Sequence, residues 1–329
     1  MRFDRVLVTG GAGFIGSHLV DELMTRGCSV TVIDNLSSGS IDNIQRWLKN
    51  PRFNFIRGDL LEMSHLRKAL EGCKAVFHLA ADPEVSRGSQ NPEAHYRQNV
   101  EATFRLLEEI RRAGQVEEIV FTSSSTVYGE ASRMPTPEDY SPLEPISVYG
   151  ASKLACEALI SAYAHTYGFK AIILRLANIV GPRSRHGVIH DFIVKLMKNS
   201  KELEILGDGS QTKSYLHVED CVKAILLAAE SSGSRIGVFN VGSEDQVNVR
   251  RIAEIVVEEM GLQGVKFRFT GGVDGGRGWP GDVKNMLLDI RKIKALGWRP
   301  QYNSEKAVRF TARSLIKEIR SEIRPLDNA

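Results

Sequence analysis

The chain has 329 residues, of which 42% are hydrophobic and 25% charged, which is the composition of a globular protein with a sizeable core. Its 43 basic and 40 acidic residues leave a formal net charge of only +3, which argues against nucleic-acid binding and anionic-membrane binding, since both need a field of one sign. The four cysteines lie far apart without metal-ligand spacing, and the apolar runs are only strand-length, so we expect no metal, no disulfides, no export signal, no membrane span and a cytoplasmic location.

The first half of the chain alternates short apolar runs with helical patterns, which is the order of a parallel sheet with crossover helices. The runs are rich in Val, Ile, Leu and Phe, as strands covered on both faces should be. We predict strands at 5–9, 29–33, 53–56, 75–79, 119–122 and 171–176. Helices are predicted at 13–26, 92–112 and 147–167. The predicted fold class is therefore α/β, a doubly wound parallel-sheet Rossmann fold.

After Asn178 the composition changes, because glycine-rich turns at 181–187, 207–209 and 271–281 separate short elements. The predicted elements here are strands at 204–206 and 238–241 and helices at 218–230 and 249–260. We assign residues 1–178 to a dinucleotide-binding domain that also carries the catalytic residues. We assign residues 179–329 mainly to a smaller C-terminal α/β substrate-binding lobe, with about 215–245 returning to the first domain. Ligands of open parallel sheets lie beyond the carboxyl ends of the strands, so we expect the substrate between the lobes.

A glycine-rich turn joins the first predicted strand to the first predicted helix. It reads Gly10-Gly11-Ala12-Gly13-Phe14-Ile15-Gly16, and glycines at this position let the backbone approach a pyrophosphate at the helix start. Asp34 ends the second strand, where a carboxylate can accept hydrogen bonds from the adenosine ribose and repel the extra phosphate of NADP. The alternative for Asp34 is an ordinary turn residue. We expect NAD as the cofactor, bordered also by the loops at 58–60 and 78–81.

Tyr149 and Lys153 lie near the start of the helix at 147–167, where a four-residue spacing places both on one face. The ordinary pKa of a tyrosine is about 10, so this phenol acts as a base at neutral pH only if positive charge stabilises its phenolate. Lys153 and a nicotinamide cation are the expected sources of that charge. The spacing alone is not specific, because Tyr302 and Lys306 repeat it with no cofactor motif nearby. The hydroxyl-rich segment 123–129 follows the fifth strand and reaches the same edge of the sheet.

Taken together, these motifs resemble the extended short-chain dehydrogenases/reductases of the NAD-dependent epimerase/dehydratase family, nearly end to end. The resemblance implies that Tyr149 is the base, that Lys153 stabilises its phenolate and that Ser124 holds the reacting oxygen. The NAD contacts that it implies are Gly10, Gly13, Phe14, Ile15, Gly16, Asp34, Asn35, Leu36, Ser38, Gly39, Asp59, Leu60, Leu79, Ala80, Ala81, Asn99, Ser123, Tyr149 and Lys153. The substrate contacts that it implies are Val85, Ser124, Tyr149, Asn178, Leu206, Lys213 and Arg277.

The reaction that the resemblance implies is NAD-dependent 4-epimerisation of a UDP-hexose through a transient 4-keto sugar. UDP-glucose and UDP-galactose come first, with UDP-N-acetylglucosamine and UDP-glucuronate as alternatives. Dehydratases and decarboxylases of this family carry acidic residues where this chain has Ser125 and Thr126, which disfavours both reactions. A non-catalytic dinucleotide sensor would not need Tyr149 and Lys153, whereas a single-pass dehydrogenase would share them. Relatives dimerise through two helices such as those at 92–112 and 147–167, so we expect a homodimer.

Overall fold

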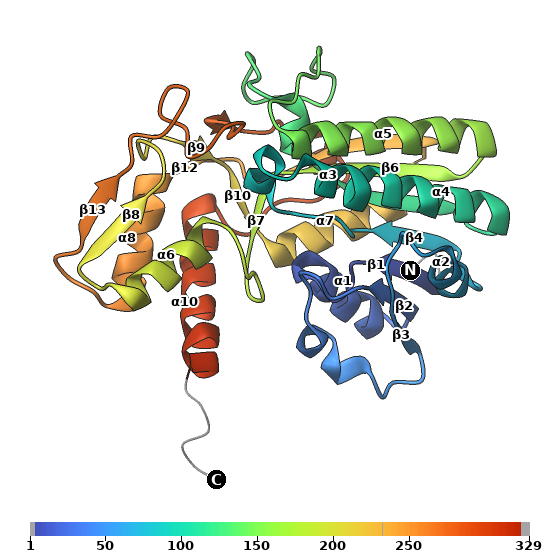
Figure 1. The fold of residues 1–329 in the computed structure, drawn as a ribbon. Coiled ribbons are helices and arrows are strands. Elements are labelled where there is room, and N and C mark those ends of the chain that lie inside the picture. The colour runs from blue at the N-terminus through green and yellow to red at the C-terminus, as the bar shows by residue number, and fades with distance from the viewer. Residues whose placement is uncertain (1–3, 232, 324–329) are drawn as a thin grey trace, which may run out of the picture.

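A parallel sheet forms the centre of the larger lobe in the computed structural model, which describes residues 4–231 and 233–323 (Figure 1). Within these residues seven strands lie in the order β11-β6-β5-β4-β1-β2-β3, and every neighbouring pair is parallel. Their bounds are β1 (Arg5–Thr9), β2 (Ser29–Asp34), β3 (Phe53–Arg57), β4 (Ala75–His78), β5 (Glu118–Ser124), β6 (Lys170–Leu176) and β11 (Ile236–Val241). From β1 the sheet grows to one side with β2 and β3 and to the other side with β4, β5 and β6. Open α/β sheets bind dinucleotides at such a switch point, here between β1 and β4. The predicted Rossmann fold is confirmed.

Helices cover both faces of this sheet and enclose two hydrophobic cores. On one face lie α1 (Phe14–Thr25) and α7 (Val218–Ser231), which contact each other. The other face is covered by α2 (Met63–Leu70), α4 (Ala102–Ala113) and α5 (Val148–Tyr167). Short helical turns lie in the connecting loops: η1 (Ile41–Asn43), η2 (Gln45–Trp47), η3 (Val85–Ser89), α3 (Pro92–His95), η4 (Tyr96–Glu101) and η5 (Ser125–Tyr128). The strands are thus buried on both faces, as their continuous apolar runs predicted.

The segment predicted as one helix at 92–112 consists of three parts, α3, η4 and α4, of which η4 is a π-helical turn. Asn99 lies in that turn and is buried. Its amide nitrogen donates to the Ser152 hydroxyl at 2.9 Å, and its oxygen accepts from the backbone N–H of Asp82 at 2.8 Å. Wider turns of this kind within a helix re-aim side chains, frequently beside functional sites. Here the turn ties the loop after β4 to α5.

The smaller lobe packs three helices around a core of its own, as Figure 1 shows on the left. These helices are α6 (Val188–Lys198), α8 (Val249–Met260) and α10 (Ser304–Ile323). Short strands accompany them: β7 (Asn178–Val180), β8 (Glu202–Ile205), β9 (Thr212–Lys213), β10 (Tyr215–His217), β12 (Val247–Asn248) and β13 (Lys266–Phe269). The strand β14 (Asn285–Met286), which pairs with β9, and the short helix α9 (Arg291–Ala295) belong to a segment that packs on the larger lobe. Among the described residues, no helix is both long and apolar enough to cross a bilayer.

Two segments beyond residue 178 lie against the larger lobe. The first comprises α7, which contacts α1, and β11, whose residues pair in parallel with β6. The second, at 283–298, was not expected, and it adds Val283, Leu288 and Trp298 to the core beneath α1 and α7. The strand expected at 204–206 is β8, and Leu206 begins the turn that follows it.

Candidate active site

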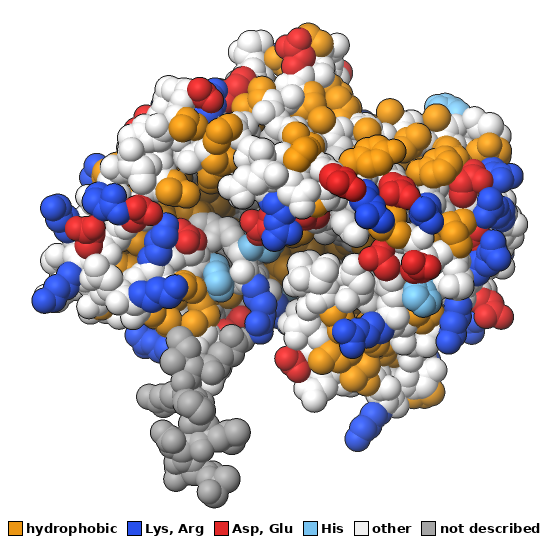
Figure 2. Space-filling model, in the orientation of Figure 1, with side chains coloured by type: hydrophobic (Ala, Val, Ile, Leu, Met, Phe, Trp, Pro, Cys, Tyr) orange, Lys and Arg blue, Asp and Glu red, His pale blue; other side chains and the backbone are white. Residues whose placement is uncertain are grey.

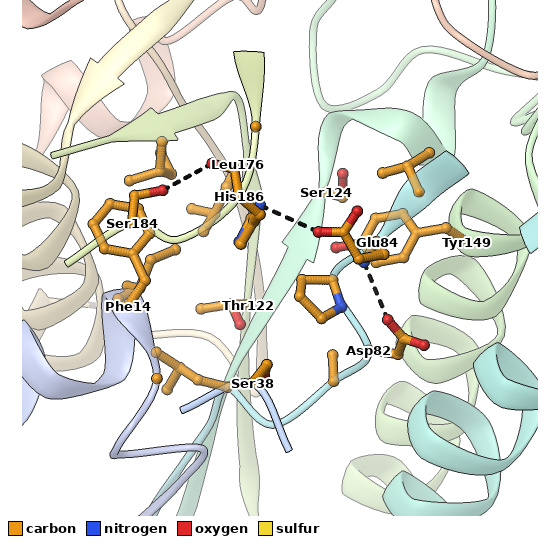
Figure 3. A pocket seen from close by; sticks show the side chains of 18 of the residues that line it. Phe14, Ser38, Asp82, Glu84, Thr122, Ser124, Tyr149, Leu176, Ser184 and His186 are labelled. Carbon is orange, nitrogen blue, oxygen red and sulfur yellow. Dashed lines mark hydrogen bonds and ion pairs between the residues drawn. The ribbon is translucent and has the colours of Figure 1, made fainter. Parts of the chain in front are cut away.

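A cleft of about 870 Å³ lies beyond the carboxyl ends of the central strands and is lined by both lobes. Figure 3 shows Phe14, from the start of α1, on one wall and Ser124 and Tyr149, from β5 and α5, on the other. The larger lobe contributes the loops after β1, β2, β4 and β5, and the smaller lobe contributes the loop after β7 and the segment around Asp282. The cleft therefore occupies the place predicted for cofactor and substrate.

The glycine-rich turn has positions that no larger residue fits. Gly10 has φ of +70°, and a Cβ there would lie 2.8 Å from Cα of Ala80. A Cβ on Gly16 would lie 2.1 Å from the carbonyl oxygen of Gly10, so α1 packs directly on the turn. A Cβ on Gly39 would lie 2.8 Å from the carbonyl carbon of Ala12. These approaches leave bare backbone and the N-terminus of α1 facing the cleft, which fits a dinucleotide pyrophosphate.

Asp34 ends β2 at the same edge and is held by backbone donors. The N–H of Ala12 donates to its Oδ2 at 2.9 Å, and the N–H of Leu36 donates to its Oδ1 at 2.8 Å. Burial raises the pKa of Asp34, although both hydrogen bonds lower it. An ionised carboxylate has about four acceptor positions. Asp34 therefore keeps capacity for two ribose hydroxyls on the side that lines the cleft.

Most of the predicted cofactor residues line the cleft. They are Gly10, Gly13, Phe14, Ile15, Gly16, Asp34, Asn35, Ser38, Asp59, Leu60, Leu79, Ala80, Ala81, Ser123, Tyr149 and Lys153. Among the described residues, three of those predicted, Leu36, Gly39 and Asn99, are not part of the lining. Each supports a neighbour: Leu36 binds Asp34, Gly39 packs on the glycine turn, and Asn99 joins α5 to the loop after β4.

Tyr149 and Ser124 meet across the junction of α5 and β5. Ser147 caps α5, since its side chain accepts from the N–H of Gly150 at 3.0 Å, so the helix begins just before Tyr149. Burial raises the pKa of Tyr149, whereas its hydrogen bond with Ser124 lowers it. The sequence predicted a stabilised phenolate with both Lys153 and a nicotinamide cation beside it. The protein groups alone do not lower the pKa, because burial disfavours the phenolate more than they favour it.

Lys153 lies one helical turn beyond Tyr149. Its ammonium donates to the carbonyl oxygen of Thr122 at 3.0 Å and lies 5.8 Å from the centroid of the Tyr149 ring. Burial lowers the pKa of Lys153 to about 8, although Cys156 and Glu157 raise it. The ammonium is thus anchored to β5 rather than in contact with the tyrosine ring.

The predicted substrate residues divide into two groups. Val85, Ser124, Tyr149, Asn178 and Lys213 line the cleft, and Lys213 donates to Asp282 at 2.5 Å. Among the described residues, Leu206 and Arg277 are not part of the lining. Leu206 is exposed in the turn after β8, and Arg277 donates to Glu130 at 2.8 Å.

Further charged or titratable residues line the cleft. Asp82, Glu84 and Arg87 come from the loop after β4, and Arg183, Arg185 and His186 come from the loop after β7. Nδ1 of His186 lies 3.8 Å from a carboxylate oxygen of Glu84, so the loops after β7 and β4 meet across the cleft (Figure 3). These loops directly follow strands, and ligands bind beyond the carboxyl ends of parallel strands, so their position in the sequence could have predicted a place in the cleft.

The second tyrosine–lysine pair lies elsewhere. Tyr302 stacks edge-to-face on His217 and Phe310, with ring centroids 5.5 and 5.1 Å apart. Among the described residues, neither Tyr302 nor Lys306 is part of the cleft lining. The same spacing therefore serves packing at one place and lines the cleft at the other.

Comparison with known proteins gives one family. The model of the NAD dependent epimerase/dehydratase family matches residues 6–242. The UDP-glucose 4-epimerase of Mycolicibacterium smegmatis is 35% identical over 308 residues, covering 90% of this chain and 94% of that protein. A crystal structure of a UDP-galactose 4-epimerase is 45% identical with a TM-score of 0.84, covering 96% and 99% of the two chains. The UDP-glucuronic acid 4-epimerase of Bacillus cereus, solved with UDP-glucuronic acid and NAD, is 31% identical with a TM-score of 0.85 and the same coverage.

Proposed function

Since the chain belongs to the NAD-dependent epimerase/dehydratase family, we propose that it is a UDP-hexose 4-epimerase that interconverts UDP-glucose and UDP-galactose. The observation that carries this proposal is the meeting of Ser124, Tyr149 and Lys153 in the cleft beside the glycine turn. The hydroxyl residues Ser125 and Thr126 beside them offer no acid for dehydration or decarboxylation. A dinucleotide sensor would have no use for this arrangement.

In the proposed reaction Tyr149 removes the proton from the sugar 4-hydroxyl. Ser124 donates a hydrogen bond to the same oxygen, and the Lys153 ammonium stabilises the phenolate through the electrostatic field of a poorly hydrated site. NAD, when bound, supplies the acceptor and donor of the C4 hydride. The 4-keto sugar then presents its other face, and Tyr149 returns the proton, so no net oxidation occurs.

The NAD site that we propose follows the lining of the larger lobe. The glycine turn receives the pyrophosphate, Asp34 receives the adenosine ribose, and the loops around Asp59 and Ala80 border the adenine and phosphate regions. Tyr149 and Lys153 face the nicotinamide ribose. Leu36, Gly39 and Asn99 act through the neighbours that they hold.

The substrate site that we propose lies towards the smaller lobe. Asn178 and Lys213 contact the diphosphate, and Val85 borders the hexose. We do not assign such contacts to Leu206 and Arg277 in the conformation described. Residues 1–178, with about 215–245, form the cofactor-binding unit, on which the segment at 283–298 also packs, and the rest forms the substrate lobe.

The decisive experiment incubates the pure protein with UDP-galactose, without added NAD, and follows the ratio of UDP-glucose to UDP-galactose by chromatography. We expect one final ratio from either sugar, and a kcat about 10²- to 10⁴-fold lower in Tyr149→Phe, the usual contribution of a general acid–base. Tyr302→Phe is the matched control, because it removes a tyrosine with the same lysine spacing from outside the cleft. No interconversion by the wild type, or equal loss in both variants, would contradict the proposal.

We further propose a cytoplasmic homodimer. The four cysteines are buried thiols outside any disulfide, which suits a reducing compartment. The helices α4 and α5 carry exposed Phe104 and Tyr167, and Figure 2 shows hydrophobic side chains over this part of the molecule. Exposed aromatic residues on two adjacent helices are typical of an interface with a second copy.

A further inference from the structure

Three residues of α5, each four positions after the last, face the carboxyl end of β5. Tyr149 lines the cleft together with Ser124, and Lys153 donates to the carbonyl oxygen of Thr122. The third is Glu157, whose Oε1 accepts from the hydroxyl of Ser123 at 2.5 Å. Residues at this spacing share one helix face. Glu157 therefore continues the row that begins with the proposed base, although the sequence analysis did not single it out.

Glu157 is a buried anion with a dedicated counter-ion. Its side chain and that of Arg175, from the neighbouring strand β6, are each 7% exposed. The guanidinium binds the carboxylate through Nη2 at 2.8 Å and through Nε at 3.1 and 3.3 Å. This geometry satisfies both carboxylate oxygens, which is what makes a buried pair tolerable.

Arg175 is held in turn by groups farther from the cleft. Its Nη1 donates to the hydroxyl of Tyr128 at 3.0 Å and to the carbonyl oxygen of Glu138 at 3.1 Å. The Tyr128 hydroxyl donates to Oδ1 of Asn240 on β11 at 2.8 Å, and the Asn240 N–H donates to Glu138 at 2.9 Å. A continuous buried network thus runs from the edge of the cleft at Ser123 to the last strand of the sheet.

We propose that Glu157, paired with Arg175, is a positioning residue that holds the end of β5 against α5. The inference rests on the proposed function only in that it assigns Tyr149 and Lys153 to the reaction. Glu157 does not touch the substrate. It acts through Ser123, whose neighbour Thr122 binds Lys153 and whose neighbour Ser124 lines the cleft with Tyr149.

The titratable groups around Lys153 determine the direction in which its pKa should change when Glu157 is replaced. On α5 they are Tyr149, Cys156 and Glu157, and on β4 it is His78, whose pKa is lowered to about 3 by burial, so that it is neutral. Burial lowers the pKa of Lys153, and Glu157 raises it. Removing the Glu157 charge must therefore lower the pKa of Lys153 further. The ammonium, and the activity that needs it, is then lost at a lower pH.

The test compares Glu157→Gln with the wild type, using whichever UDP-sugar the wild type turns over. We expect kcat to fall about 10- to 100-fold, the usual effect of a small misplacement in an active site, with KM changed less than about threefold. The alkaline limb of the kcat profile should move to lower pH. Glu109→Gln is the matched control, since Glu109 is also buried and paired with two arginines but lies on α4, outside the cleft lining.

A second variant covers failure of the first to fold, because Glu157→Gln leaves Arg175 buried without a counter-ion. Glu157→Gln with Arg175→Met removes both charges together. A smaller movement of the alkaline limb in the same direction is expected, because loss of the Arg175 charge partly offsets loss of the Glu157 charge. A profile that stays in place in a folded variant, with kcat reduced as in Glu109→Gln, would overturn the positioning role. A wild type that turns over other UDP-sugars but not UDP-glucose or UDP-galactose would overturn the proposed function instead and leave this comparison intact.

Discussion

At the scale of single residues, burial and nearby charges have opposite effects on the pKa values of the proposed catalytic groups. Tyr149 lies where burial raises its pKa, and its hydrogen bond with Ser124 only partly offsets that effect. Lys153 is anchored to the Thr122 carbonyl and is itself close to losing its proton at neutral pH, since burial lowers its pKa to about 8. The protein groups alone therefore do not make Tyr149 a strong base. The positive charge of oxidised nicotinamide is the remaining contribution, which would restrict proton removal to the cofactor form that can accept the hydride.

Asp34 offers a prediction about cofactor choice. Asp34→Asn keeps the shape of the side chain but removes the charge that binds ribose hydroxyls and repels a 2′-phosphate. Hydrogen bonds to charged groups contribute about 1.5–3 kcal/mol, so we expect NAD affinity to fall about tenfold or more while discrimination against NADP decreases. Titration calorimetry on protein freed of NAD measures both affinities. Asp42→Asn, at an exposed position in η1, is the control, and an unchanged NAD-to-NADP ratio in Asp34→Asn would refute this role.

At the scale of helices and strands, local sequence patterns predicted the bounds of several elements but not which distant segments pack together. The helix α8 has the bounds predicted from its apolar spacing, and β1 has those of its apolar run. In contrast, nothing local indicated that 283–298 packs on the larger lobe or that Glu157 meets Arg175, because those contacts join distant parts of the chain. The position of Glu157, two four-residue steps after Tyr149, was visible in the sequence, but its role became clear only from the position of β6.

The glycine turn provides a prediction at this scale. In Gly16→Ala the new Cβ would lie 2.1 Å from the carbonyl oxygen of Gly10, so α1 must move away from the turn. We expect loss of tightly bound NAD and a destabilisation of about 1–3 kcal/mol, typical of overpacking. The NAD content per chain and the free energy of unfolding check this result. Gly233→Ala is the control, since a Cβ there meets no atom within 4 Å, and bound NAD at wild-type level in Gly16→Ala would contradict the argument.

At the scale of the whole molecule, contacts between the two lobes hold the walls of the cleft in place. Arg183 follows β7 in the smaller-lobe wall, and its guanidinium binds Ser17 at 3.1 Å and Asp21 at 2.8 Å on α1. The carbonyl oxygen of Pro182 lies 3.2 Å from the ring of His18, also on α1. Both contacts reach the helix that starts at the glycine turn. The element proposed to bind the pyrophosphate therefore also sets the position of the substrate wall.

The proposed homodimer leads to the last prediction, which concerns the face of α4 and α5. Phe104 is 44% exposed and packs edge-to-face with Tyr163, and Tyr167 extends the same aromatic row. A carboxylate introduced at position 104 would be buried without a counter-ion in the dimer but hydrated in the monomer. Phe104→Asp should therefore raise the dimer dissociation constant at least about 30-fold. Light scattering after size-exclusion chromatography gives the mass. Leu48→Asp changes a residue of similar exposure, 42%, in the loop before β3 and should remain dimeric. A monomeric wild type, or a Phe104→Asp protein as dimeric as Leu48→Asp, would place the interface elsewhere or remove it, and would leave the aromatic row on α4 and α5 to be explained by another partner.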